Sequence, residues 1–245
     1  MSGFIKDMKI TLIMPRVLKN IFDDREFLRV YDLLLPLSAH YQDVMMIHME
    51  ALKDCNPIID LACGTGNLTI KYLEAGKTVT GYDRAGMSLR KLYDKAEEKG
   101  FLDRITFVQG DIADLEEIKD CAFEGVSSMM AAHLSDDYEG HIREAHRVLK
   151  PGGVFVITAR KEGGDQERLV RVLEASLKSQ DVFEKYQSEF EILSQRLLRT
   201  AGRRSQSLLS TDVALDILSK SGFSTVGNVP NKTEGVMYTL EAYKT

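Results

Sequence analysis

The stretch PIIDLACGTGNLTIKYLEAGKTVTGYD, residues 57–83, decides the fold of this chain. Its first apolar run, 58–62, is too short for a helix and is bounded by a proline and by glycines, as buried parallel strands are. A glycine-rich turn follows, then a helix expected over 68–75, and then a second strand that begins at 78 and runs into Asp83. This order predicts a nucleotide-type cofactor site at the carboxyl ends of two neighbouring strands.

The turn and the carboxylate have separate parts in that site. Gly64 and Gly66 permit a tight turn and let a ligand approach the backbone, and Asn67 can cap the helix that follows. Asp83 projects from a strand end beside the turn, where a carboxylate can accept both hydroxyls of a ribose and would repel a ribose phosphate. Two glycines after a strand are often only a turn, so the prediction depends on the whole combination.

The position three residues after the second glycine distinguishes between cofactors. A dinucleotide-binding fingerprint would have a third glycine there, which admits a pyrophosphate and packs the helix closely, and this chain has Thr69. The sequence therefore disfavours a diphosphate ligand.

The string DLACGTGN, residues 60–67, with an acidic residue at the end of the next strand, closely resembles motif I and the acidic loop of class I S-adenosylmethionine-dependent methyltransferases. The resemblance continues through a third strand expected at 105–108. It extends to SSMMAAHLSDDYEGHIREAHRVLKPGGVFVIT, residues 127–158, which is similar to the family's fourth strand, helix, KPGG turn and fifth strand. The match covers 57–158 in register, with no insertion needed.

The resemblance implies S-adenosylmethionine as the cofactor and S-adenosylhomocysteine as the product. In that family the acidic residue after the third strand meets the adenine amino group and the next apolar residue packs on the ring, and Asp111 and Ile112 match these positions. The cofactor-binding residues that the resemblance implies here are Tyr31, Asp60, Ala62, Cys63, Gly64, Thr65, Gly66, Asp83, Arg84, Asp111, Ile112 and Ala131.

The expected fold class is α/β. We expect a doubly wound, mostly parallel seven-stranded sheet with an antiparallel C-terminal hairpin, an N-terminal helical cap and a helical lid insertion. The 245 residues suit one such domain with additions. Our division of the single domain 1–245 is a helical cap (1–54), a cofactor-binding core (55–160), a helical insertion (161–206) and a C-terminal helix with the hairpin (207–245).

The cap and the insertion are expected to shape an acceptor pocket, because in the resembled family such additions commonly cover the cofactor and carry specificity. Tyr31 and Tyr41 are core residues or pocket residues, two alternatives that the sequence leaves open. The methionine cluster of the cap is expected in the core, with an apolar acceptor pocket as the alternative; its members are Met45, Met46 and Met49.

Three arginines of the insertion share one face of an amphipathic helix: Arg196, Arg199 and Arg203. A basic stripe on a helix is usually a solvated face. The alternative is that one of them binds a carboxylate or phosphate of the acceptor, a geometry for which arginine is suited. Tyr41 and these arginines form the predicted substrate-binding set.

His133 is the candidate catalytic residue. A sulfonium methyl group is already an activated electrophile, so the protein needs chiefly to align an acceptor lone pair and to keep water out. A general base is required only when the acceptor must lose a proton. His133 follows the fourth strand and should point toward the cleft, although a wall residue is the alternative. His40 and His48 are weaker candidates.

Composition agrees with a soluble intracellular enzyme and with the small-molecule acceptor that we expect. The net charge of −5 and a pI near 5.6 disfavour a nucleic-acid substrate, and no apolar run approaches the roughly 20 residues that span a bilayer. The N-terminus interleaves lysines with apolar residues, so we expect no cleaved signal and a cytoplasmic protein, as a monomer or homodimer. Three cysteines without paired spacing predict neither a disulfide framework nor a metal site.

Three functions remain open from the sequence. The leading one is methyl transfer to an N, O, S or C atom of a small molecule. This acceptor can carry an anionic group. A protein that binds S-adenosylmethionine without catalysis or as a regulator is the second. An NAD-dependent oxidoreductase is the third, and it is disfavoured because the third glycine is absent.

Overall fold

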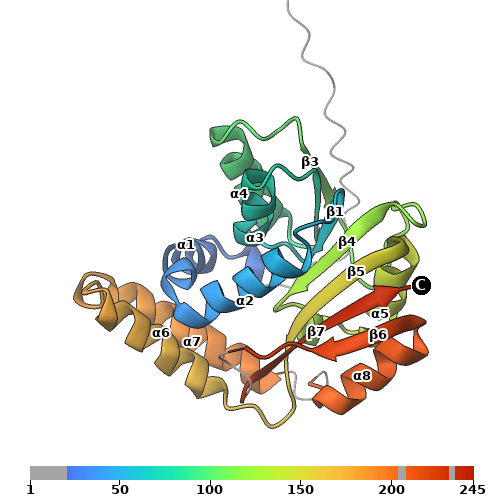
Figure 1. Ribbon diagram of the computed structural model, residues 1–245. Coiled ribbons are helices and arrows are strands. Elements are labelled where there is room, and N and C mark those ends of the chain that lie inside the picture. The colour runs from blue at the N-terminus through green and yellow to red at the C-terminus, as the bar shows by residue number, and fades with distance from the viewer. Residues whose placement is uncertain (1–20, 204–207, 232–234) are drawn as a thin grey trace, which may run out of the picture.

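The computed structural model describes residues 21–203, 208–231 and 235–245. One seven-stranded sheet runs through these ranges in the order β3-β2-β1-β4-β5-β7-β6, with β7 antiparallel to both of its neighbours and the other pairs parallel (Figure 1). The expected fold class is thereby confirmed. The strands are β1 (Ile58–Leu61), β2 (Val79–Asp83), β3 (Ile105–Gln109), β4 (Phe123–Met129), β5 (Leu149–Arg160), β6 (Phe223–Asn228) and β7 (Met237–Lys244).

Four of the helices begin at a side-chain cap, in which the oxygen of Asp24, Asp137, Asp165 or Ser210 accepts a backbone N–H from the first turn. The helices are α1 (Arg25–Leu34), α2 (Ala39–Ala51), α3 (Asn67–Glu74), α4 (Gly86–Glu98), α5 (Tyr138–Val148), α6 (Gln166–Ser179), α7 (Gln187–Arg203) and α8 (Thr211–Lys220). Short 3-10 helices are η1 (Ile21–Asp23), η2 (Leu35–Leu37), η3 (Ala132–Leu134) and η4 (Glu184–Tyr186).

Helices cover both faces of the sheet because the buried strands are apolar on both sides. Along β1, Ile58 packs into a core shared with α2, α3 and α4, whereas Ile59 packs into a core shared with α5 and α8. This alternation along a fully buried strand is typical of a doubly wound parallel sheet. The carboxyl ends of the parallel strands are left to form a site at one edge of the sandwich.

A third hydrophobic core joins the cap to the insertion. α1 packs against α7 and α2 against α6, and Phe27 and Leu34 of α1 share this core with Leu173 of α6 and Leu193 of α7. In Figure 1, α6 and α7 run alongside each other away from the sheet, with α1 and α2 between them and the rest of the molecule. Two segments that lie far apart in the sequence therefore make one structural unit.

Polar contacts fix the cap to the core. Asp32 of α1 accepts the Thr65 hydroxyl of the glycine-rich turn and an ion pair from Lys95 Nζ at 3.0 Å, with Lys91 Nζ at 3.4 Å. These groups are half-buried or better, so solvent screens the pairs only in part. These contacts therefore fix α1 of the cap to the glycine-rich turn and to α4.

The buried ring of His48 ties α2 to the sheet. Its Nδ1 lies 3.0 Å from Ser127 Oγ and its Nε2 lies 2.9 Å from Thr158 Oγ1, and the Thr158 hydroxyl in turn pairs with Thr239 at 2.8 Å. Burial lowers the pKa of His48 to about 3, so the ring is neutral. A fully hydrogen-bonded neutral ring in the core is structural, and His48 has no access to a substrate.

Three local expectations are corrected, and the first concerns the start of α3. Gly66 occupies the N-cap position with a φ of 81°, and no side chain caps the helix. Asn67 is already the first helical residue, and its side chain instead accepts Lys95 Nζ at 2.8 Å and donates to the Tyr41 hydroxyl at 3.4 Å. The left-handed conformation of Gly66 turns the chain sharply, so that the Asn67 side chain points toward Tyr41 of α2.

The second correction concerns the KPGG segment, residues 150–153, which we expected as a turn before the fifth strand. It lies within β5, where the pairing jumps from Phe123 opposite Leu149 to Gly125 opposite Val154. The segment is therefore a bulged extension of β5, and Gly152 has the positive φ of 79° that the bulge requires.

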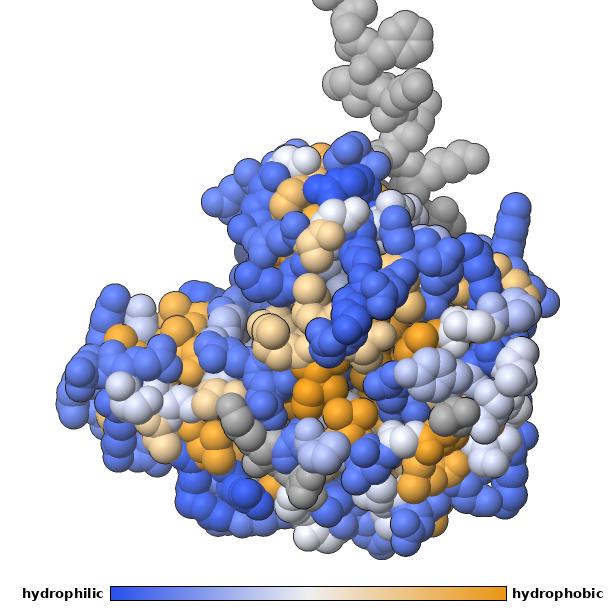
Figure 2. Space-filling view, viewed as in Figure 1, coloured by the Kyte–Doolittle hydropathy of each residue, from blue (hydrophilic) through white to orange (hydrophobic). Residues whose placement is uncertain are grey.

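The third correction concerns Met46, which is 65% exposed, while Met45 and Met49 pack against buried clusters as expected. Met46 lies on the face of α2 that points away from these clusters, and it packs against none of their described residues. Figure 2 shows a surface that is mostly hydrophilic, with hydrophobic residues reaching it in groups near the middle of this face.

None of the described helices is long and apolar enough to cross a membrane. The expectation about a signal segment rests on residues 1–20, which lie outside the described residues.

Candidate functional site

A first pocket lies at the carboxyl ends of β1, β2 and β4 and has a volume of about 820 Å³, counting the part open to solvent. All residues predicted to bind the cofactor line it except Gly66, and the predicted substrate residue Tyr41 lines it as well. Its lining is Phe22, Tyr31, Tyr41, Asp60, Ala62, Cys63, Gly64, Thr65, Asn67, Leu68, Asp83, Arg84, Gly110, Asp111, Ile112, Met129, Met130, Ala131, Leu134 and Ser135.

The two glycines of the turn do different things. Gly64 has a φ of 55°, and a Cβ placed on it would meet no protein atom within 4 Å, so the space beside it is open to a ligand. Gly66 has a φ of 81°, and a Cβ there would overlap the fully buried side chain of Leu92 on α4. The first glycine borders the pocket, whereas the second allows α4 to pack against the turn.

Asp83 is buried at the end of β2 and braces the turn. One carboxylate oxygen accepts the Gly64 N–H at 2.8 Å and the other accepts the Ala85 N–H at 2.7 Å. Burial raises the pKa of Asp83, while these two backbone bonds oppose the rise. Each carboxylate oxygen has a further lone-pair direction, so the group can still accept hydrogen bonds from two hydroxyls.

Asp60 forms the floor of the pocket and is 2% exposed. The Thr69 hydroxyl donates to it at 2.6 Å, and no lysine or arginine among the described residues forms an ion pair with it. Burial raises the pKa of Asp60 to about 7. A positively charged ligand group placed against this buried carboxylate would stabilise its ionised form.

Ile112 and Asp111 follow β3 at the side of the pocket. Ile112 is buried and can give an apolar surface to a flat ring, whereas Asp111 is exposed and one of its oxygens accepts the Ala113 N–H at 3.0 Å. The other oxygen is available to an amino group. This pairing of an apolar surface with an acceptor at its edge suits a purine with an exocyclic amine.

A second pocket of about 730 Å³ adjoins the first. Phe22, Tyr31, Met130 and Leu134 line both, so the two spaces meet at these side chains. The remaining lining residues come from the cap, the insertion, η3 and the end of β5; they are Phe27, Leu35, His40, His133, Arg160, Leu169, Leu173 and Leu197. The sequence analysis missed most of this wall because its members are far apart in the chain.

His133 lies in the second pocket, 5% exposed, on η3 directly after β4. Its Nδ1 accepts the backbone N–H of Arg160 at 3.4 Å. In the neutral ring this bond puts the hydrogen on Nε2. His40, on the same wall, pairs through Nδ1 with Ser38 Oγ at 2.6 Å, and burial lowers its pKa to about 4.

The arginines of α7 lie elsewhere. Arg196 forms an ion pair with Asp24 at 3.1 Å, Arg199 is exposed, and the side chain of Arg203 lies outside the described part of the structure. Neither Arg196 nor Arg199 lines either of the two pockets. The buried arginine of the second pocket is Arg160, which the sequence analysis did not single out.

Within residues 21–203, 208–231 and 235–245, no group of three or more His, Cys, Asp or Glu side chains is placed to hold a metal ion.

Comparison with known proteins agrees with this arrangement. Residues 58–153 match the family model described as a methyltransferase domain. The chain is similar to a demethylmenaquinone methyltransferase of Thermus thermophilus, with 33% identity over 52% of this chain and 59% of that protein. It is also similar to a sterol 24-C-methyltransferase of Aspergillus fumigatus, with 30% identity over 45% of this chain and 29% of that protein. The chain thus spans about a third of the length of the sterol relatives.

A solved structure from Methanococcus maripaludis, described as a candidate S-adenosyl-L-methionine-dependent methyltransferase, has the same fold. The superposition has a TM-score of 0.63 at 17% identity and covers 95% of this chain and 97% of that one. At this identity the likeness concerns the fold alone, and it extends over the cap and the insertion as well as the sheet.

Proposed function

Because this chain carries a methyltransferase domain of the class I S-adenosylmethionine-dependent family, we propose that it transfers the methyl group of S-adenosylmethionine to a small-molecule acceptor. The observation that carries the proposal is the open space beside Gly64, directly next to the braced carboxylate of Asp83. A ligand can approach the turn there and offer two hydroxyls to that carboxylate.

The residues of the first pocket fit this cofactor. Asp83 would hold the ribose hydroxyls, and the backbone around Gly64 would contact the ligand closely. Ile112 and Asp111 would receive the adenine ring and its amine. Asp60 would lie against the cationic methionyl part, because a positive group offsets the cost of ionising this buried carboxyl. We propose the remaining predicted lining residues, from Tyr31 to Ala131, as further contacts.

The second pocket would hold the acceptor. It meets the first at Phe22, Tyr31, Met130 and Leu134, so an acceptor seated in it can reach a ligand in the first pocket. When bound, S-adenosylmethionine would supply an activated methyl group: the acceptor lone pair would bond to the methyl carbon as the carbon–sulfur bond breaks, and S-adenosylhomocysteine would be the leaving group. The apolar walls of this chain contribute by excluding water and by fixing the line of attack.

We propose that His133 positions the acceptor. Its ring lines the second pocket, and the hydrogen bond from the Arg160 N–H to its Nδ1 holds the ring in place, so His133 can shape the space in which the acceptor lies. A general-base role at Nε2 would need the other tautomer and the loss of that bond. This favours a positioning role over that of a general base.

A small-molecule acceptor is supported by three observations. The relatives named above are a demethylmenaquinone and a sterol methyltransferase. The second pocket is lined mainly by apolar side chains with a few polar groups, as small-molecule sites are, and the net charge of −5 disfavours a polyanionic nucleic acid.

The test is calorimetric titration of the purified chain with S-adenosylmethionine, S-adenosylhomocysteine and NADH in parallel, after any copurified ligand has been removed. Binding of the two adenosyl-sulfur compounds without NADH is the expected result. Binding of NADH alone, or of none of the three, would overturn the proposal. Methyl transfer to an added acceptor then separates an enzyme from a binding protein.

A further inference from the structure

Arg160, the last residue of β5, is the one arginine or lysine among the described residues that line the second pocket. It is 8% exposed. None of its side-chain N–H groups forms a hydrogen bond or ion pair within residues 21–203, 208–231 and 235–245; only its backbone N–H is bonded, to His133. Burial without a compensating carboxylate lowers the pKa of Arg160, although a guanidinium stays charged at any physiological pH.

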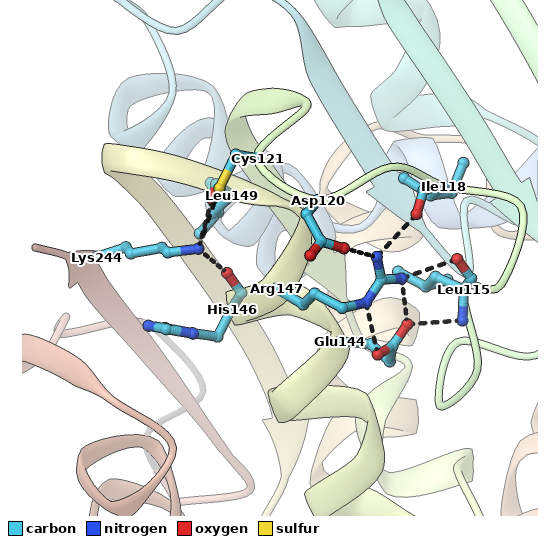
Figure 3. A network of polar contacts seen from close by, with 9 residues as sticks. All are labelled: Leu115, Ile118, Asp120, Cys121, Glu144, His146, Arg147, Leu149 and Lys244. Atoms are coloured by element: carbon cyan, nitrogen blue, oxygen red, sulfur yellow. Dashed lines mark hydrogen bonds and ion pairs between the residues drawn. The ribbon is translucent and has the colours of Figure 1, made fainter.

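Arg147 shows what a structural arginine looks like in this protein (Figure 3). Its side chain donates five hydrogen bonds, to both Glu144 oxygens, to Asp120, and to the backbone carbonyls of Leu115 and Ile118. These use the full donor capacity of a guanidinium, and the carboxylates raise the pKa of Arg147. Arg160 is more deeply buried and has none of these partners.

Burial of a charge without a partner lowers the stability of the folded state, because the charge loses its hydration. An anionic group of a bound ligand would compensate the charge of Arg160. The described lining of the second pocket contains no aspartate or glutamate that could take this part. Its other polar side chains include His40 and His133, and burial keeps His40 neutral by lowering its pKa to about 4. Among the described lining residues, Arg160 is therefore the one side chain with a fixed positive charge.

We propose that the second pocket selects acceptors with an apolar body and one carboxylate, and that the side chain of Arg160 binds this carboxylate. The inference rests on the proposed function, since it names the acceptor class of the same site. One guanidinium matches one singly charged, planar group in a two-pronged geometry, whereas a phosphate dianion would leave one charge uncompensated. Leu169, Leu173 and Phe27 supply the apolar contact.

The bound carboxylate is then a handle and not the methylated group. With both oxygens held by a guanidinium, its negative charge is stabilised and it is a poorer nucleophile. The methylated atom lies elsewhere on the acceptor, at the junction with the first pocket. Arg160 does not line that junction, which consists of Phe22, Tyr31, Met130 and Leu134.

The test uses the full chain saturated with S-adenosylhomocysteine and measures the binding of octanoate and of its neutral amide, octanamide, by calorimetry. Octanoate should bind the unaltered chain about 10- to 100-fold more tightly, the range for a charge-assisted pair out of water. Arg160→Gln should abolish this preference and leave octanamide binding unchanged. Arg196→Gln is the matched control, since it removes an arginine that is paired with Asp24 outside the pocket, and it should keep the preference.

Three results would overturn the inference. They are equal binding of octanoate and octanamide to the unaltered chain, an undiminished preference in Arg160→Gln, and tighter binding of octyl phosphate than of octanoate. The first and the third need no variant, so a folding defect cannot hide the answer, and Arg160→Lys, which keeps a point charge, should retain part of the preference.

Two further measurements separate this inference from its premise. Since the Arg160 side chain has no partner within the described ranges, Arg160→Gln should not lower the melting temperature of the free protein, as removal of a structural arginine would. S-adenosylhomocysteine should bind all variants equally. Its failure to bind the unaltered chain would refute the proposed function, whereas binding without carboxylate selectivity would refute only the acceptor class.

Discussion

The two pockets share four side chains and have opposite charge. The first has three acids, Asp60, Asp83 and Asp111, against one base, Arg84, in its lining, while the second has Arg160 and no acid among its described residues. A cationic ligand is favoured in one and an anionic ligand in the other. The difference teaches that this protein can separate two ligands by charge before any detail of shape is involved.

The pockets also differ in what they are made of. The first is formed largely at strand ends and at a turn, where backbone groups and a braced carboxylate are fixed by the fold. The second is formed by side chains from η1, α1, η2, α2, η3, β5, α6 and α7. Changes in the first should therefore alter affinity and folding together, and changes in the second should alter selectivity with little effect on the fold.

The largest expected effect is that of Asp83→Ala. It removes two charge-assisted hydrogen bonds to the ribose, and S-adenosylhomocysteine should bind at least about 100-fold more weakly by calorimetry. Asp216→Ala, which removes a carboxylate paired with Lys220 on α8, is the control and should bind normally. Normal affinity in Asp83→Ala would mean that the carboxylate does not face the ligand.

The glycine pair tests whether the first pocket combines folding with binding. Gly66→Ala forces a side chain into a left-handed position and against Leu92, so urea unfolding should show a loss of about 2–4 kcal/mol. Gly64→Ala meets only the backbone strain, about 1 kcal/mol, but its methyl group projects into the open space and should weaken cofactor binding. Equal losses of stability in the two variants would contradict the distinction.

The charge of the first pocket can be tested through Asp60. An unfolded Asp titrates near 3.9 and this one near 7, so between these values the folded protein holds an extra proton and loses stability as the pH rises. A cationic ligand favours the ionised form, so the affinity for S-adenosylmethionine should rise by up to about tenfold per pH unit from 5.5 to 7. Asp60→Asn should remove this dependence. A flat profile in the unaltered protein would exclude a cation against Asp60.

The smallest effect is expected at His133. One positioning contact contributes about 1 kcal/mol, so His133→Leu should lower the turnover of an identified acceptor about fivefold. His133→Gln retains an N–H donor and should restore most of the rate, with an unchanged pH profile. A general base would behave differently, because both variants would then lose about 100-fold or more and the pH profile would lose a limb.

The sequence predicted the first pocket well because its parts are local. A strand, a turn, a helix and a second strand occupy 27 consecutive residues, 57–83, and the pattern of apolar and glycine residues determines which ends meet. Asn67 was assigned wrongly as a cap because a composition rule favours asparagine there, whereas the left-handed Gly66 already occupies that position. The class of the fold did not depend on this detail.

The second pocket could not be predicted in the same way. Arg160 ends the run FVITAR and has no local pattern that distinguishes it from any arginine after a strand. The stripe on α7 has such a pattern, yet Arg196 pairs with Asp24 and Arg199 is exposed. Which arginine lacks a partner depends on how the cap and the insertion pack, and that packing joins residues more than one hundred positions apart.

The contact between Gly66 and Leu92 has a consequence for descent. If a duplicate of this gene lost its reaction, selection on Gly64 would weaken, because only the backbone strain would remain, whereas Gly66 would still be held by its strain and by the contact with Leu92 of α4. Gly66 is thus constrained by the packing of α4, and Gly64 chiefly by the space that a ligand needs. A descendant in which Gly64 is replaced and Gly66 is kept would be a protein that retained the fold after losing the reaction.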